Sequence, residues 1–253
     1  MPGDAAIRAE NIVKAFGRVT ALNGVSMHVA RGETLGILGD NGAGKSTLIK
    51  ILTGFHQPDA GQVLIDGRPV ALGSVGEARA LGVECVYQDL ALVNGLSIYL
   101  NLFLNREIVR PGPFRLLDHK TMRRRARAAL ADIGIAVASV DLEVGALSGG
   151  QRQAIAVARA VSSDARILLL DEPLAAMGAR EARLIIDLIE RLKSRGDIAI
   201  VMIAHNYAQT LEICDRVMLM QHGEVTFESA AGHTSAEELL EIVRREYRAA
   251  RTG

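Results

Sequence analysis

The segment GDNGAGKST, Gly39 to Thr47, constrains the fold of this chain more than any other part of its sequence. It has the spacing G-x-x-x-x-G-K-S and follows the apolar run TLGIL, so it predicts a strand, a phosphate-binding loop and a helix that begins at Lys45. The three glycines let successive backbone N–H groups point at phosphate oxygens, and the helix N-terminus favours negative charge. The alternative is a glycine-rich turn that caps an ordinary helix.

The side chains of this loop suit a nucleotide and its metal ion. We expect the Lys45 ammonium to reach the β- and γ-phosphates of a nucleoside triphosphate and the Ser46 hydroxyl to ligate Mg²⁺. The expected nucleotide-binding residues are Gly39, Asp40, Asn41, Gly42, Ala43, Gly44, Lys45, Ser46 and Thr47. The motif predicts a nucleoside triphosphate site but does not indicate which of many protein families owns it.

A second motif, RILLLDEP at positions 166–173, places two adjacent carboxylates after an apolar strand. Ligands of open α/β sheets bind where the strands end, so Asp171 and Glu172 are expected to face the nucleotide. We expect Asp171 to hold Mg²⁺ and Glu172 to orient or deprotonate the attacking water. Alone, Asp-Glu-Pro is equally good chemistry for an ordinary turn, and the upstream phosphate loop favours the catalytic interpretation.

The hydrophobic pattern predicts an α/β fold with a mostly parallel sheet. Short β-type runs between positions 7 and 38 suggest antiparallel hairpins that lead into a central strand, and VECVYQ at 83–88 predicts a further buried strand. RILLLD and IAIVMI, with an amphipathic helix near 179–195 between them, form a βαβ pattern. A hairpin that turns at His222 and Gly223 and a charged helix from about Ser235 complete the pattern.

Positions 89–160 differ from the rest, because strand signals vanish there and a basic helix runs through DHKTMRRRARAALADIG. We therefore expect an inserted helical subdomain at 89–160. The ATP-binding core, with an antiparallel β subdomain and a C-terminal helix, would comprise 1–88 and 161–253.

The string LSGGQ, Leu147 to Gln151, begins another predicted helix and is the most specific motif in the chain. On these motifs the chain resembles the ATP-binding cassette (ABC) ATPases from about residue 7 to residue 228, which implies the P-loop NTPase core of the ABC ATPase fold. Ser148, Gly149, Gly150 and Gln151 would form a second anion cradle at a helix start. The plain alternative is a serine-capped helix with a flexible entry.

The resemblance implies a partner, because in this family the signature of one subunit closes on the P-loop nucleotide of another. A second copy of this chain is expected to supply it in a head-to-tail homodimer with two ATP molecules. It also implies roles for three residues. Phe16 would stack on adenine, Gln88 would sense Mg²⁺ and water, and His205 would contact the γ-phosphate. Otherwise Phe16 is a core aromatic, Gln88 a solvated strand end and His205 a structural histidine.

The loop after Glu172 departs from the family pattern. It reads LAAMGARE and has Gly178 where an aspartate is common, so that side chain cannot bridge two subunits. Its contribution would come from the backbone or from Ala175 and Ala176.

Charge argues against nucleic acid as a partner, because 29 basic and 29 acidic residues cancel. No apolar run approaches the roughly 18 residues of a membrane span, so we expect the chain to stay in the cytoplasm, and the resemblance implies a peripheral protein on the cytoplasmic face of the membrane. The stretches VYQDLALVNGLSIYLNLFLNRE, LDHKTMRRRARAAL and IAHNYAQTLEICDRVMLMQHGE resemble the monosaccharide-import branch, of ribose, xylose and fructose type.

That resemblance implies transmembrane permease subunits and, indirectly, an extracytoplasmic sugar-binding protein, with a coupling groove along Asp89 to Leu104. Two alternatives stay open. One is the ATPase of another ABC transporter, for a different solute or for export. The other is a soluble cassette ATPase that acts on DNA or ribosomes, against which the neutral charge argues.

Overall fold

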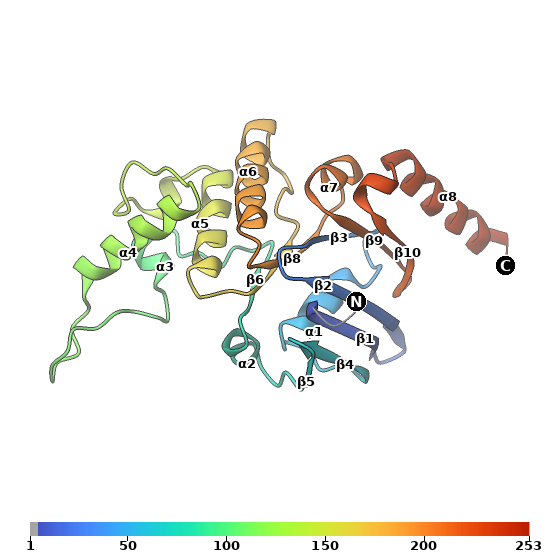
Figure 1. Ribbon diagram of the computed structural model, residues 1–253, viewed down its shortest axis with the longest axis horizontal. Coiled ribbons are helices and arrows are strands. Elements are labelled where there is room, and N and C mark those ends of the chain that lie inside the picture. Colours follow the sequence, from blue (N-terminus) through green and yellow to red (C-terminus); the bar gives the residue numbers. More distant parts are fainter. Residues whose placement is uncertain (1–4, 253) are drawn as a thin grey trace.

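The computed structural model describes residues 5–252, with side chains described through residue 246, and arranges them as two sheets with surrounding helices (Figure 1). The strands are β1 (Ala5–Phe16), β2 (Val19–Ala30), β3 (Thr34–Leu38), β4 (Ala60–Ile65), β5 (Arg68–Val70), β6 (Val83–Val86), β7 (Ile167–Asp171), β8 (Ala199–Ile203), β9 (Arg216–Gln221) and β10 (Glu224–Ala230). The α-helices are α1 (Lys45–Leu52), α2 (Val75–Ala80), α3 (Ile98–Leu102), α4 (His119–Asp132), α5 (Gly149–Val161), α6 (Ala179–Arg195), α7 (Tyr207–Ile213) and α8 (Ala236–Thr252), and the segments η2 (Val144–Ala146) and η3 (Ala231–His233) are 3₁₀ helices.

The expected α/β architecture is confirmed. One sheet has the order β2-β1-β4-β5 and is antiparallel throughout. The other has the order β10-β9-β3-β8-β7-β6, in which β9, β3, β8, β7 and β6 run parallel and β10 pairs antiparallel with β9. The run TLGIL is therefore the fully buried strand β3 near the middle of this larger sheet.

Alternate residues of the parallel strands face two separate cores. On β7, Leu168 and Leu170 pack with α5 and α6, whereas Ile167 and Leu169 pack with α1 and the antiparallel sheet. This is the expected result for strands buried on both faces, where successive side chains point in opposite directions. Helix α1 consequently lies between the two sheets, and α5 covers the opposite face of the larger sheet.

Helices α3, α4 and α5 group at one end of the molecule, within the segment for which a helical subdomain is predicted (Figure 1). Helix α4 buries Met122, Ala126 and Leu130, which share one face, and leaves most of its arginines exposed. The boundaries of that subdomain remain a prediction.

The strand predicted for VECVYQ is shorter than expected. β6 ends at Val86, which lies opposite Leu170 in the parallel pair, and one residue later β7 ends at Asp171 and turns away. With no neighbouring strand to pair beyond that point, Tyr87 and Gln88 continue as a loop, and Gln88 is exposed.

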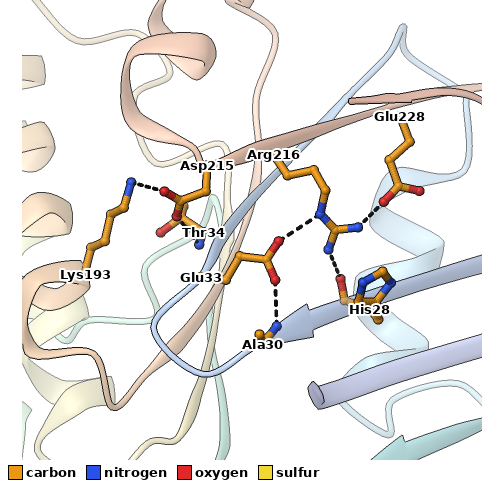
Figure 2. A network of polar contacts seen from close by, with 8 residues as sticks. All are labelled: His28, Ala30, Glu33, Thr34, Lys193, Asp215, Arg216 and Glu228. Atoms are coloured by element: carbon orange, nitrogen blue, oxygen red, sulfur yellow. Dashed lines mark hydrogen bonds and ion pairs between the residues drawn. The ribbon is translucent and has the colours of Figure 1, made fainter. Parts of the chain in front are cut away.

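A network of polar contacts centred on Arg216 joins the two sheets (Figure 2). The Arg216 guanidinium, on β9, donates to the Glu33 carboxylate at 2.8 Å, to Glu228 of β10 and to the backbone oxygen of His28 on β2. Glu33 also accepts a hydrogen bond from the Ala30 backbone N–H at 2.7 Å. The network therefore attaches the end of the antiparallel sheet to the edge of the larger one.

The last elements follow the sequence prediction. His222 and Gly223 both have positive φ, 49° and 81°, which suits the tight β9–β10 hairpin, and α8 begins at Ala236. Among the described residues, no helix combines the length and the apolar character needed to cross a bilayer.

Candidate nucleotide site

The glycines of the phosphate loop are required by their surroundings. A Cβ on Gly39 would lie 2.2 Å from the Met220 backbone oxygen, and one on Gly44 would lie 2.5 Å from that of Ala21. Both residues also have positive φ, 142° and 100°. The loop can therefore follow this path between β3 and α1 only with glycine at these two positions.

Lys45 is the first residue of α1 and is almost completely buried, with 5% of its surface exposed. Its ammonium donates to the backbone oxygens of Gly39 at 2.6 Å and Asp40 at 2.9 Å. Burial lowers the pKa of Lys45, and the nearby carboxylates of Glu172, Asp40 and Asp171 partly oppose this. Phosphate oxygens arriving at the loop would compete with the two carbonyls for this cation.

The rest of the loop is accessible. Asp40, Asn41, Gly42 and Ser46 are exposed, Gly44 and Thr47 are half-buried, and Ala43 packs into the core below. A hollow of about 80 Å³ beside the loop is lined in part by Asn41, Gly42 and His222. The exposed residues of the loop leave its surface open to a ligand.

Asp171 and Glu172 emerge where β7 ends, close enough to Lys45 to interact with it electrostatically. Burial raises the pKa of Asp171, the neighbouring Glu172 raises it further, and Lys45, Lys50 and His205 oppose the rise. The fold thus brings together the phosphate loop and the carboxylate pair, which are far apart in the sequence.

Glu172 and His205 are in direct contact. The His205 Nε2 and Glu172 Oε1 atoms lie 2.6 Å apart, with side chains 41% and 20% exposed, respectively. Glu172 has a φ of 53°, a left-handed conformation that is uncommon for this residue type, and its backbone N–H donates to the Ile203 oxygen at the end of β8. Neighbouring strand ends therefore hold this pair together, beside a cavity of about 260 Å³.

Gln88 lies two residues after the end of β6, on the same side of the sheet as Asp171, where the parallel strands have their carboxyl ends. The segment that follows Gln88 is held by Arg159 of α5, whose guanidinium donates to the backbone oxygens of Leu90 at 2.9 Å and Ala91 at 2.8 Å. Sequence reasoning missed Arg159. Its only signal was a charged residue within the otherwise apolar end of a helix.

Phe16 ends β1 and is 44% exposed. Its ring meets the edge of His56, with centroids 5.2 Å apart, and the Lys14 ammonium lies 5.6 Å from the ring centroid. The residue is therefore not the buried core aromatic of the alternative interpretation. His56, which follows α1, is a neighbour of Phe16 that sequence reasoning did not identify.

The signature segment forms a capped helix start. The Ser148 hydroxyl accepts from the Gln151 N–H at 3.3 Å, and the Gln151 side-chain oxygen accepts from the Ser148 N–H at 3.0 Å. Glu181 of α6 supplies a further acceptor, to which the Gly150 N–H donates at 3.2 Å. Because α5 and α1 cover opposite faces of the larger sheet, the structure does not unite the signature with the phosphate loop of the same chain.

Comparison with known proteins agrees with these motifs. The ABC transporter family profile matches residues 22–175. A xylose/arabinose import ATP-binding protein of Sulfolobus acidocaldarius is 42% identical, over 94% of this chain and 93% of its own length. A fructose import ATP-binding protein of Rhizobium meliloti is 42% identical, over 88% of this chain and 87% of its own length. A ribose import ATP-binding protein of Chromobacterium violaceum is 39% identical over 94% of this chain, which spans 46% of that relative.

Solved structures show the same fold. The ATP-binding cassette of an ABC transporter in its ADP conformation superposes with a TM-score of 0.79, at 27% identity and with 93% of each chain covered. A dimeric cassette in a post-hydrolysis state, bound to ADP and phosphate, gives a TM-score of 0.74 at 25% identity, with 89% of this chain and 98% of that chain covered. Family profile, relatives and fold agree, and the chain belongs to the ATP-binding proteins of the ABC transporter family.

Proposed function

We propose that this chain is the ATP-hydrolysing subunit of an importer for a monosaccharide of the xylose, fructose or ribose type. It would act at the cytoplasmic face of the membrane, beside transmembrane permease subunits that receive sugar from an extracytoplasmic binding protein. The contact between Glu172 and His205, at strand ends that face the buried Lys45, carries the proposal of hydrolysis. The assignment of a monosaccharide as the transported solute is supported by two import relatives, for xylose/arabinose and for fructose, that are each 42% identical.

In this proposal each residue of the site has a separate task. Lys45 and the loop N–H groups bind the β- and γ-phosphates. Glu172 accepts a proton from the attacking water, whose oxygen bonds to the γ-phosphorus as the bond to the bridging β–γ oxygen breaks and ADP departs. His205 contacts the Glu172 carboxylate through Nε2 in the separate subunit and is proposed to contact the γ-phosphate when ATP is bound. Phe16 contributes an accessible ring for adenine.

The residues proposed for Mg²⁺ fit that ion chemically. Ser46, Gln88 and Asp171 offer hydroxyl, amide and carboxylate oxygens, which are hard ligands suited to Mg²⁺. Asp171 is half-buried next to a second carboxylate, and a cation would offset both the burial and the repulsion from Glu172 that raise its pKa. When bound, the ion would neutralise charge that develops on the phosphates.

The placement of the signature supports a homodimer. One chain carries a phosphate loop on one side of its larger sheet and a signature cradle on the other, so two copies related head to tail would complete two sites. In such a sandwich Ser148, Gly149, Gly150 and Gln151 would face the γ-phosphate held by the partner. The relation to a dimeric cassette structure is consistent with this arrangement.

Coupling to the permease is proposed to run through the segment after Gln88. Arg159 fixes the Leu90 and Ala91 carbonyls to the signature helix, so a shift of Gln88 on nucleotide binding would reach α5 directly. Leu92 and Leu96 are partly buried and lie at the start of the expected coupling groove.

The test of hydrolysis is the Glu172→Gln variant. The amide keeps the size and the contact to His205 but cannot accept the proton, so turnover should fall by about 10²- to 10⁴-fold while ATP still binds. ATP with Mg²⁺ should then trap a dimer in size-exclusion chromatography that ADP does not support. Glu190→Gln, on the exposed side of α6, is the matched control. Hydrolysis at the wild-type rate in Glu172→Gln would refute the catalytic assignment.

The sugar is tested separately in proteoliposomes that contain the cognate permease subunits. Binding protein loaded with xylose, fructose or ribose should stimulate ATP turnover for one of these sugars. Stimulation by an unrelated solute instead would assign the importer to another class.

A further inference from the structure

The signature cradle is filled by the chain's own carboxylate. Glu181 lies in the first turn of α6, which packs beside α5 (Figure 1). Its Oε1 atom accepts from the Gly150 N–H at 3.2 Å, and the Ser148 hydroxyl is near enough to the same carboxylate to lower its pKa. These are donors of the cradle that is proposed to receive the phosphate of the partner's ATP.

Close approach of the two helices makes this contact possible. A Cβ on Gly150 would lie 2.8 Å from the Glu181 Cβ and 3.2 Å from its Cα. A side chain at position 150 would therefore push the start of α6 away from the cradle. Glycine at this position admits the Glu181 carboxylate as well as leaving room for a phosphate.

Glu181 lies at the start of two helices at once. The pKa of Glu181 is lowered, most of all by the hydrogen bond from the Gly150 backbone. The Ser148 side chain, the Gly178 backbone and the charge of Arg152 lower it further. The carboxylate is therefore ionised at neutral pH. Gly178 provides no side-chain cap for α6, so the Glu181 carboxylate partly replaces one.

We infer that Glu181 is an internal anion that occupies the signature cradle of the separate subunit and is displaced by the γ-phosphate when the ATP sandwich closes. This rests on the proposed function. A carboxylate and a phosphate compete for the same N–H and O–H donors, and two anions at one helix start repel each other. The backbone of Gly178 can retain the displaced carboxylate, so a side-chain rotation is enough to open the cradle.

The effect on closure can be bounded. An anion at an exposed helix N-terminus is stabilised only modestly, but each sandwich contains two cradles, so both carboxylates must leave. Removing the charge should therefore increase the ATP-dependent dimerisation constant by about 3- to 30-fold. Glu181 thus sets how much ATP is needed for closure.

The experiment uses the full chain with Glu172→Gln, in which ATP is not consumed. Dimer formation is followed by analytical ultracentrifugation over a range of ATP concentrations, with and without Glu181→Gln. The neutral amide should lower the ATP concentration that gives half-maximal dimer. Glu190→Gln removes the same charge from the same helix, away from the cradle, and should leave that concentration unchanged. Glu181→Ala is a second variant that removes the carboxylate and should also lower the ATP concentration for half-maximal dimer. Its unfolding midpoint is measured to check that the protein stays folded.

The outcomes separate this inference from the proposed function. Suppose that Glu172→Gln dimerises with ATP, but that the double variant with Glu181→Gln needs as much ATP as Glu172→Gln alone, or more. The native Glu181 carboxylate then does not oppose closure and only orders the loop, which refutes the inference alone. If Glu172→Gln does not dimerise under any ATP concentration, the sandwich itself is refuted, and the role of Glu181 with it.

Discussion

Arg216→Met should destabilise the protein more than the loss of an ordinary surface arginine. Methionine keeps most of the aliphatic stem of Arg216, so the substitution mainly removes the guanidinium and its bonds to Glu33, Glu228 and the His28 oxygen. The Arg216 and Glu33 side chains are only 16% and 19% exposed. Glu33 would therefore keep its charge in a largely desolvated place.

The expected magnitude follows from that exposure. Removing one partner of a fully buried ion pair costs about 3–5 kcal/mol, because the other charge is left uncompensated. Here Glu33 retains the Ala30 N–H at 2.7 Å, and Glu228 is 34% exposed and can be rehydrated. We therefore expect the free energy of unfolding to fall by about 2–3 kcal/mol, below the fully buried case.

The assay is urea unfolding followed by far-ultraviolet circular dichroism, with the slope of the transition checked for constancy. Arg183→Met is the control, because Arg183 also contacts three carboxylates but is 58% exposed, and its loss should cost about 0.5 kcal/mol or less. Adding Glu33→Gln to Arg216→Met should restore about 1 kcal/mol by removing the unpaired charge. Equal losses for the two arginine variants would refute the reasoning.

Two further predictions concern charges that serve the site at some cost to the fold. Lys45→Met should abolish ATP binding, measured by calorimetry, and a protein that still binds ATP would contradict the role of Lys45. The same substitution should not lower the urea midpoint, because burial disfavours the charged lysine in the folded state. Asp171→Asn should abolish Mg²⁺-dependent hydrolysis and raise the urea midpoint at neutral pH. The folded-state pKa of Asp171 is above its unfolded value, so the carboxylate costs stability above both pKa values and that cost disappears as the pH falls through the folded pKa. The stability gap between the variant and the wild type should therefore close in acid, and a gap independent of pH would contradict this cause.

Much of the site could be read from contiguous residues. A strand, a loop and a helix start are specified by neighbours in the sequence, so GDNGAGKST, DEP and LSGGQ predicted their local structures, and the βαβ pattern placed α6 at 179–195 as observed. Where a strand ends depends on its neighbour instead. β6 was predicted to reach Gln88 and ends at Val86, because its partner β7 turns away after Asp171.

Only the tertiary structure decided which distant side chains meet. The DEP motif predicted a role for Glu172 and the family resemblance a separate one for His205, but their 2.6 Å contact depends on β7 and β8 ending side by side. The Arg159 bonds to the Leu90 and Ala91 carbonyls likewise depend on packing between segments remote in the chain. Glu181 illustrates the limit best. In the sequence it is an unremarked acid in a helix, and it reaches the Gly150 N–H because a glycine lets α5 and α6 approach closely. Local chemistry is encoded by adjacent residues, whereas these contacts arise from the register of the sheet and the packing of helices on it, which no short segment specifies.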